Sequence, residues 1–207
     1  LHRRMGYDST DISRVDDETQ TYIIEAVAGD YNEQSNRQGY SQPFGAGLLG
    51  LAASTGELVV ANDATAHPDF LLAEGFPVIN SELIIPIKIY KKVYALLNIE
   101  SSKYNAFDDY EVAAFSTLGD QISLSLESIH LFESTKRQLQ ELTILHAIAQ
   151  AAVNAKSEDE LVERATEIIG ATLYTDKFGF LLMSPEQDKL NVHPSYRGID
   201  YTAPSTV

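Results

Sequence analysis

The chain has 207 residues, of which 44% are hydrophobic and 22% are charged, a composition typical of a folded globular protein. Its 15 basic and 30 acidic residues give a net charge of −15, which argues against nucleic acid or an anionic membrane surface as the main partner. The absence of cysteine excludes disulfides, thiolate metal sites and cysteine nucleophiles from this sequence. No apolar run has membrane-spanning length and no signal peptide is recognisable, so we expect a cytoplasmic protein without membrane insertion.

The first half of the chain is predicted to be mostly β-structure. Apolar runs separated by turn residues predict, in chain order, strands 9–15 and 21–28, a short helix 48–54, and strands 57–61, 83–89 and 93–99. The last two strands are apolar on both faces, as expected of strands that are covered on both sides. Pro86 cannot donate a hydrogen bond to a sheet and is therefore expected at an edge or a bulge.

A long helix is predicted from residue 108 to about residue 155. Asp108 or Asp109 can cap its start, and Glu111 can supply the return bond of a capping box. Such a helix would extend ~70 Å, and helices of this length usually coil with a partner. Apolar residues at heptad spacing, interrupted near Lys136, predict a seam that joins two copies in a homodimer and transmits helix shifts. A static spacer is the alternative. The proposed seam residues are Phe115, Leu118, Ile122, Ile129, Phe132, Leu142 and Leu145.

The end of the chain repeats its beginning. Ser157 and Glu160 form a capping box at a second helix, and a strand pair follows over 177–184 and 190–196. This pair aligns with the first strand pair, so that Asp176 falls on Asp8, 168 positions earlier. We therefore expect a piece of a longer protein in three parts. These parts are a sensor domain over 1–135 that lacks its first helix, a linking helix over 136–156, and the incomplete start of a second domain over 157–207.

Six segments, by their order and spacing, resemble a GAF domain, which is a small-molecule-sensing module of signalling proteins. The segments are 47–50, 56–63, 81–87, 93–101, 106–107 and 118–123. The resemblance covers residues 1–135, and residues 139–207 look like the start of a second such domain. It implies an α+β fold with a central antiparallel sheet flanked by helices, a ligand pocket on one face of the sheet, and terminal helices that pair between protomers.

The functional signatures of the GAF family are only partly present. The motif of cyclic-nucleotide phosphodiesterases is matched by Lys103 and Phe107, whereas Ser102, Glu111 and Val112 depart from it, so cyclic-nucleotide binding remains an alternative. The family's methionine sulfoxide reductases and its cysteine-linked bilin proteins both require cysteine, and this chain has none.

The resemblance implies that the loop 63–70 borders the ligand pocket. His67 is either a pocket residue, including an axial haem ligand, or a solvated loop histidine, and Asp63 either accepts from a ligand or closes an Asx turn. The glycines at 45, 47 and 50 lack the flanking strand and lysine of a phosphate-binding loop. The candidate ligand residues are Asp63, His67, Phe70, Phe76, Ser81, Ile85 and Leu97, and no catalytic or metal-ligating set is expected.

Three functions remain open on this basis. The leading hypothesis is a non-catalytic sensor of an unidentified small molecule, dimeric through the long helix, which controls an output domain outside the sequence, such as a histidine kinase of a two-component system or a nucleotide cyclase. The second is a structural dimerisation and relay module with no ligand. The third is an enzyme that uses carboxylates of the pocket. No cofactor can be named from the sequence.

Overall fold

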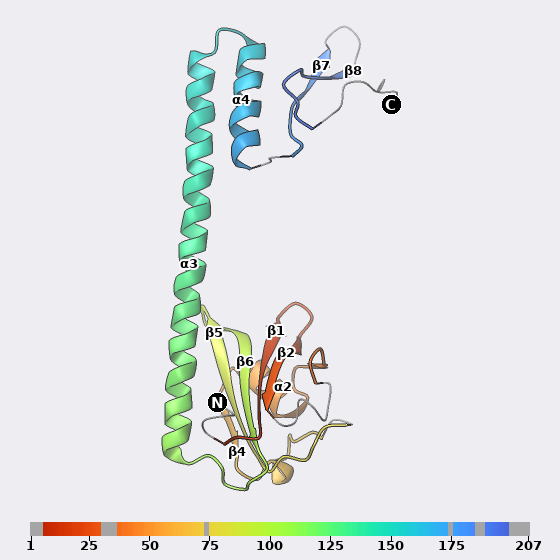
Figure 1. The fold of residues 1–207 in the computed structure, drawn as a ribbon, viewed down its shortest axis with the longest axis vertical. Coiled ribbons are helices and arrows are strands. Elements are labelled where there is room, and N and C mark those ends of the chain that lie inside the picture. Colours follow the sequence, from red (N-terminus) through yellow and green to blue (C-terminus); the bar gives the residue numbers. More distant parts are fainter. Residues whose placement is uncertain (1–5, 30–36, 73–74, 174–175, 185–188, 199–207) are drawn as a thin grey trace. The chain divides into compact units, whose positions relative to one another are not determined.

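The computed structural model describes residues 6–29, 37–72, 75–173, 176–184 and 189–198. The chain divides into two compact units, residues 1–130 and residues 131–207, and each is described by itself. The first unit is α+β, with one antiparallel sheet that has helices on both faces (Figure 1). None of the described helices combines the length and apolarity needed to cross a membrane.

The sheet of the first unit has six strands in the order β3-β2-β1-β6-β5-β4, and all neighbours are antiparallel. The strands are β1 (Ser9–Asp16), β2 (Thr21–Gly29), β3 (Ser41–Pro43), β4 (Val59–Ala61), β5 (Ser81–Ile89) and β6 (Lys92–Ser101). Five of them were predicted, and the short edge strand β3 was not. Pro86 lies in a part of β5 that only β6 pairs, because β4 reaches no further than Ile84. The prediction of an edge position for Pro86 is therefore confirmed.

Helix α2 (Gly47–Thr55) covers one face of the sheet, and its core includes Leu49, Ile84 and Leu96. Helix α2 ends at Gly56, whose positive φ of 67° is the left-handed conformation that glycine adopts most easily. The opposite face holds a second core that includes Leu83, Ile85, Leu97 and Phe115. Strands β5 and β6 are thus buried on both faces, as their continuous apolar sequences predicted.

Helix α3 (Asp109–Asn154) is one continuous helix of 46 residues. Asp108 caps it, because its carboxylate accepts from the Glu111 N–H at 2.8 Å while Glu111 accepts from the Asp108 N–H at 3.1 Å. Phe115 is buried in the core of the first unit, and Leu118 and Ile122 pack against the same core. The prediction that these three residues face a partner chain is therefore wrong, because the unit's own sheet covers them.

The second unit contains the end of α3, helix α4 (Glu158–Thr172) and the hairpin β7 (Leu181–Ser184) and β8 (Lys189–Val192). Ser157 caps α4 by accepting from the Glu160 N–H. The return bond of Glu160 goes to the Lys156 N–H rather than to Ser157 itself. The hairpin repeats the register of the first: Leu181 pairs with Val192, and 168 positions earlier Ser13 pairs with Ile24.

Candidate functional site

A small cavity of about 60 Å³ lies on the α2 side of the sheet. It is bounded by side chains from β2, β3, β5 and α2 and from the segments before β3 and before β5. Its lining residues are Tyr22, Ile24, Tyr40, Gln42, Leu49, Phe70, Leu71, Leu72, Phe76, Pro77, Ile79 and Glu82. The cavity is therefore apolar on most sides, with a few polar groups that converge from the sheet, as is usual for small-molecule sites.

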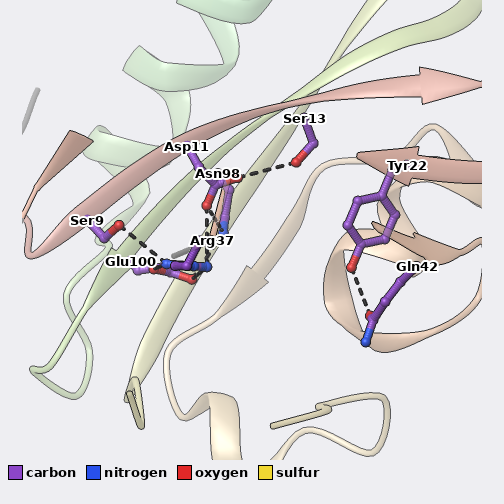
Figure 2. Close-up of polar contacts among 8 residues, drawn as sticks. All are labelled: Ser9, Asp11, Ser13, Tyr22, Arg37, Gln42, Asn98 and Glu100. Carbon is purple, nitrogen blue, oxygen red and sulfur yellow. Dashed lines mark hydrogen bonds and ion pairs between the residues drawn. The ribbon is translucent and has the colours of Figure 1, made fainter. Parts of the chain in front are cut away.

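The sheet beside this cavity carries a row of buried polar side chains, which we call the polar floor. The row crosses three adjacent strands, β1, β6 and β5. Within each strand its members are alternate residues, which face the same side of the sheet. The polar floor consists of Ser9, Asp11, Ser13, Glu82, Asn98 and Glu100, all buried (Figure 2 shows all but Glu82). Glu82 and Glu100 are direct cross-strand neighbours, an arrangement that destabilises the sheet while both are ionised.

Arg37 supplies the positive charge at the polar floor (Figure 2). Its guanidinium donates to both carboxylate oxygens of Glu100, at 2.5 and 2.7 Å, and lies 3.5 Å from Asp11. It also donates to the Ser9 hydroxyl at 3.4 Å. A two-pronged arginine–carboxylate contact is among the strongest polar contacts in proteins, so Arg37 is held firmly on Glu100.

Asn98 connects two carboxylates of the polar floor, those of Asp11 and Glu100. Its amide nitrogen donates to Asp11 at 3.1 Å and to Glu100 at 3.2 Å. The Asn98 carbonyl oxygen and the Nε of Arg37 are buried without a hydrogen-bond partner among the described residues. Both atoms therefore have unused hydrogen-bonding capacity within the polar floor.

Burial dominates the electrostatics of the polar floor. Loss of solvent raises the pKa of Asp11 from 3.8 to about 7, and the negative charge of Glu100 adds to this effect, while Arg37 and the bonds from Asn98 and Ser13 oppose it. Burial also raises the pKa of Glu82 well above its ordinary value, again reinforced by Glu100 and Asp11. Burial lowers the pKa of Arg37, but the hydrogen bonds and the negative charge of Glu100 outweigh it and raise this pKa above its ordinary value, so the guanidinium remains charged.

Aromatic rings form the wall opposite the polar floor. The Arg37 guanidinium lies over the Phe76 ring at 4.8 Å from its centre, and the Tyr40 and Phe76 ring centres are also 4.8 Å apart. Tyr22 donates to Gln42 at 2.9 Å, and Gln42 donates to the Tyr40 hydroxyl. Burial raises the pKa of the Tyr22 phenol above its ordinary value, so this hydroxyl keeps its proton.

The structure separates the ligand residues expected from the sequence into two groups. Phe70 and Phe76 line the cavity, which agrees with their assignment. Asp63 instead caps a short 3-10 helix, η2 (Ala64–Ala66), by accepting from the Ala66 N–H, and His67 accepts from the Asp69 N–H within its own loop. Neither of these two side chains is among the cavity-lining residues.

Three further residues were expected at the pocket. Ser81 is buried, but its hydroxyl bonds the backbone carbonyls of Asn62 and Lys103 and so fixes loops. Ile85 and Leu97 belong to the core on the α3 side of the sheet. Ile85 and Leu97 therefore do not line the small cavity, because residues an odd number of positions from Glu82 and Asn98 face the opposite side, where Ile85 borders a separate hollow of about 580 Å³.

Sequence reasoning missed Asp11, Glu82, Glu100 and Arg37, because charged residues are usually exposed. One signal was present at Glu82. It directly precedes the mostly apolar strand predicted over 83–89, and a strand longer by one residue would bury this acidic side chain.

A second hollow, of about 580 Å³, lies on the α3 side of the same unit. It is lined by residues of β5 and α3 and by the segment after α2, including Leu58, Lys88, Ser123 and Leu124. Acidic and basic side chains both border it, so its charge favours no single class of ligand.

Histidine, serine and aspartate also meet in the second unit. The Ser195 hydroxyl lies 2.7 Å from Nδ1 of His193, and Nε2 of His193 lies 3.5 Å from Asp159. The Ser195 N–H donates to the same Nδ1, and the Ser195 hydroxyl donates to Thr166 at 2.9 Å. We interpret the group as the closure of the turn after β8, because the Ser195 N–H and hydroxyl both contact Nδ1 of His193, only two residues away, and the hydroxyl also bonds Thr166 of α4. No cluster of metal-ligating residues occurs within the described ranges.

The comparison with known families decides the identity of the first unit. A family profile described as a GAF domain matches residues 4–127. The chain belongs to the GAF domain family. The resemblance found from sequence motifs is thereby confirmed, together with the α+β fold that it implied.

Two curated relatives match part of this GAF protein. Protein YtsP of Bacillus subtilis is 26% identical over 84 residues, which are 41% of this chain and 50% of YtsP. Protein ZMO0507 of Zymomonas mobilis is 32% identical over 77 residues, or 37% of this chain and 47% of the relative. The chain thus spans about half the length of the curated relatives that it matches.

Solved structures agree with the fold. The GAF domain of an Acinetobacter phosphoenolpyruvate-protein phosphotransferase is 25% identical, with a TM-score of 0.52 over 64% of this chain and 78% of that one. The corresponding domain from Coxiella burnetii is 23% identical, with a TM-score of 0.55 over 65% and 80%. A free methionine-R-sulfoxide reductase from Neisseria meningitidis is 22% identical, with a TM-score of 0.52 over 59% and 69%. The GAF fold is therefore found both as a domain of a phosphotransferase and in a methionine sulfoxide reductase.

Proposed function

We propose that the chain is a non-catalytic sensory and dimerisation module of a signalling protein. A small molecule binds in the cavity beside the polar floor, and α3 passes the resulting change to the next unit and to an output domain. The main support for this proposal is that β5 contributes to both sides of the sheet. Glu82 lines the cavity, while its neighbour Leu83 packs in the core on the α3 side.

Direct contacts between β5 and α3 support transmission. The Lys88 N–H donates to the Ser123 hydroxyl at 2.9 Å, and the Tyr90 N–H, just after β5, donates to the Glu127 carboxylate at 2.7 Å. At Gly119 the helix approaches the strand so closely that a Cβ atom would overlap with the side chain of Ile85. A displacement of β5 by a ligand would therefore move α3 or break these contacts.

Exposed apolar residues of α3 support a dimer. Ile129, Phe132, Leu142 and Leu145, which remain from the predicted seam, are between 54% and 70% exposed. Leu124, Leu131 and Leu139 on the same helix are comparably exposed. Large apolar side chains concentrated on one helix are typical of a protein–protein interface, so we assign these residues to a homodimer contact.

The absence of cysteine supports a role without catalysis, even though the fold is shared with a methionine sulfoxide reductase. One observation favours a second candidate, a structural relay module that binds nothing. The cavity of about 60 Å³ is smaller than ordinary ligand sites, which hold about 300–1,000 Å³. Binding of a ligand therefore requires that a side chain of the pocket moves.

A thermal-shift screen with nucleotides and metabolites separates the two candidates. We expect at least one compound to raise Tm in a saturable manner, and Phe76→Ala to weaken that response, because Phe76 forms part of the wall. Tyr104→Ala is the matched control, since Tyr104 is 56% exposed and not part of the lining. A Tm that no compound raises would instead support the structural relay module.

A further inference from the structure

The polar floor contains three carboxyl groups, whereas Arg37 is the one cation that pairs with it among the described residues. Asp11, Glu82 and Glu100 are each more than nine-tenths buried. Arg37 pairs with Glu100 and Asp11, whereas Glu82 has no ion pair within the described part of the chain. A buried carboxyl group without a cation keeps its proton, in line with the raised pKa of Glu82, and it can ionise when a positive group comes to lie beside it.

Arg37 is held in the way that proteins hold a cationic ligand. Two nitrogens of its guanidinium donate to the Glu100 carboxylate, and the Phe76 ring covers another side of the guanidinium. This combination of a charged fork and a ring face suits planar or compact organic cations. Apolar lining residues such as Leu49, Phe70 and Ile79 extend from it and would suit an alkyl body.

The backbone of Arg37 is held separately from its side chain, so that the side chain could move away from Glu100 without unfolding the strands. Its backbone lies in a turn before β3, fixed by the bond from the Tyr40 N–H to the Arg37 carbonyl and by the bond from the Gly39 N–H to Ile24. The side chain alone reaches the polar floor and lies over Phe76, which lines the cavity, so a change of side-chain rotamer would vacate Glu100 next to the cavity wall while the turn stays in place.

We propose that this pocket binds a small organic cation, an alkylguanidinium or alkylamine, and that Arg37 is the chain's own occupant of the cation site. The ligand replaces the Arg37 guanidinium between Glu100 and Asp11, and Glu82 and the free carbonyl of Asn98 accept its remaining protons. The proposal rests on the sensory function proposed above, because it names the ligand class of the same pocket. Arg37 thereby acts as a built-in competitor that sets the ligand concentration needed for a response.

The first test replaces the internal cation by one from solution. Arg37→Ala is expected to lower Tm, and millimolar methylguanidinium is expected to raise it again in a saturable manner, while the neutral isostere methylurea does not. Arg14→Ala is the matched control, because Arg14 pairs with Glu25 on the exposed part of the sheet and leaves no pocket behind. Equal effects of methylguanidinium and methylurea on Arg37→Ala would overturn the proposal.

The second test uses the unaltered pocket and decides the question even if Arg37→Ala does not fold. Titration calorimetry of the whole chain with butylguanidinium is expected to show binding that Glu82→Gln weakens at least about tenfold. Butylurea is expected not to bind. Binding that is absent, or that is unchanged in Glu82→Gln, would contradict the proposal.

The two proposals fail separately. If a neutral metabolite binds the cavity and alters α3 while butylguanidinium does not bind, the cation inference is wrong and the sensory function stands. If butylguanidinium binds through Glu82 without any change in hydrogen exchange of α3, the cation site stands and the sensory function is wrong.

Discussion

At the scale of single residues, Arg37 is the side chain on which the polar floor depends most. Arg37→Met keeps much of the volume but removes the charge, which leaves Glu100 and Asp11 buried without a cation. We expect the free energy of unfolding to fall by about 3–5 kcal/mol, measured by urea denaturation. Arg14→Met serves as the control, and we expect little change because that ion pair is exposed. Similar losses in both variants would show that the cluster contributes no more than a surface pair.

The raised pKa of Asp11 predicts a pH dependence of stability. Because the folded protein binds this proton more tightly than the unfolded chain, the stabilisation is complete below pH 3.8 and is lost as the pH rises through about 7. The groups that face Asp11 are Arg37, Glu100, Asn98 and Ser13, with the charge of Glu82 nearby. Asp11→Asn removes the titration, so its stability relative to the unaltered protein should rise between about pH 4 and pH 7. A difference in unfolding free energy that is constant over this range would contradict the assignment.

At this scale, the sequence indicated aromatic residues of the cavity but none of the charged residues of the polar floor. Aromatic residues such as Phe70 and Phe76 are expected in a pocket, and both line the cavity. Ile85 was assigned to the pocket by its hydrophobicity alone, although two-residue periodicity places Ile85 and Glu82 on opposite faces. Arg37 could not be placed at all, because it lies in a connecting segment and nothing local specifies that its side chain reaches Glu100, 63 positions further on.

At the scale of elements, the contact between α3 and β5 is the feature most open to a direct test. Gly119→Ala would favour the helix intrinsically by ~1 kcal/mol, but the added methyl overlaps with Ile85. We expect the overlap to dominate and to lower the free energy of unfolding by about 1–3 kcal/mol. Ser128→Ala at an exposed position of α3 is the control and should not destabilise. A Gly119→Ala protein that is more stable than the original would mean that α3 is not docked closely on β5.

The elements themselves were largely predictable, because each carries a local signal. The capping box at Asp108 and Glu111 defined the start of α3, and the apolar runs defined β5 and β6. The partner of α3 was not predictable in the same way. Heptad spacing says only that one face of a helix is covered, and for Phe115, Leu118 and Ile122 the covering surface is the unit's own sheet.

At the scale of the whole molecule, the exposed half of the predicted seam tests the homodimer. Leu142→Glu combined with Leu145→Glu places charge on two side chains that are each more than 60% exposed. We expect these substitutions to convert a dimer to a monomer in light scattering while circular dichroism and Tm of the first unit remain unchanged. Lys136→Glu, also on α3 and exposed, is the control. A monomeric mass for the unaltered chain at high micromolar concentration would exclude the dimer.

The repeated organisation of the chain could be recognised in the sequence, because aligning two segments does not require knowing which residues are in contact. The offset of 168 positions found for Asp8 and Asp176 returns in the pairing of Met183 with Leu190, which matches that of Val15 with Tyr22. The division at residue 130 falls within α3, near the predicted domain boundary at residue 135.

We expect that binding of a ligand in the pocket of the first unit changes the structure of α3 beyond that unit. Hydrogen–deuterium exchange of the whole chain, with and without the compound that raises Tm most in a metabolite screen, tests it most directly. We predict changed exchange rates at the amides of residues 131–154 as well as at β5. A change confined to residues 6–130, with α3 unaffected beyond that point, would contradict the account.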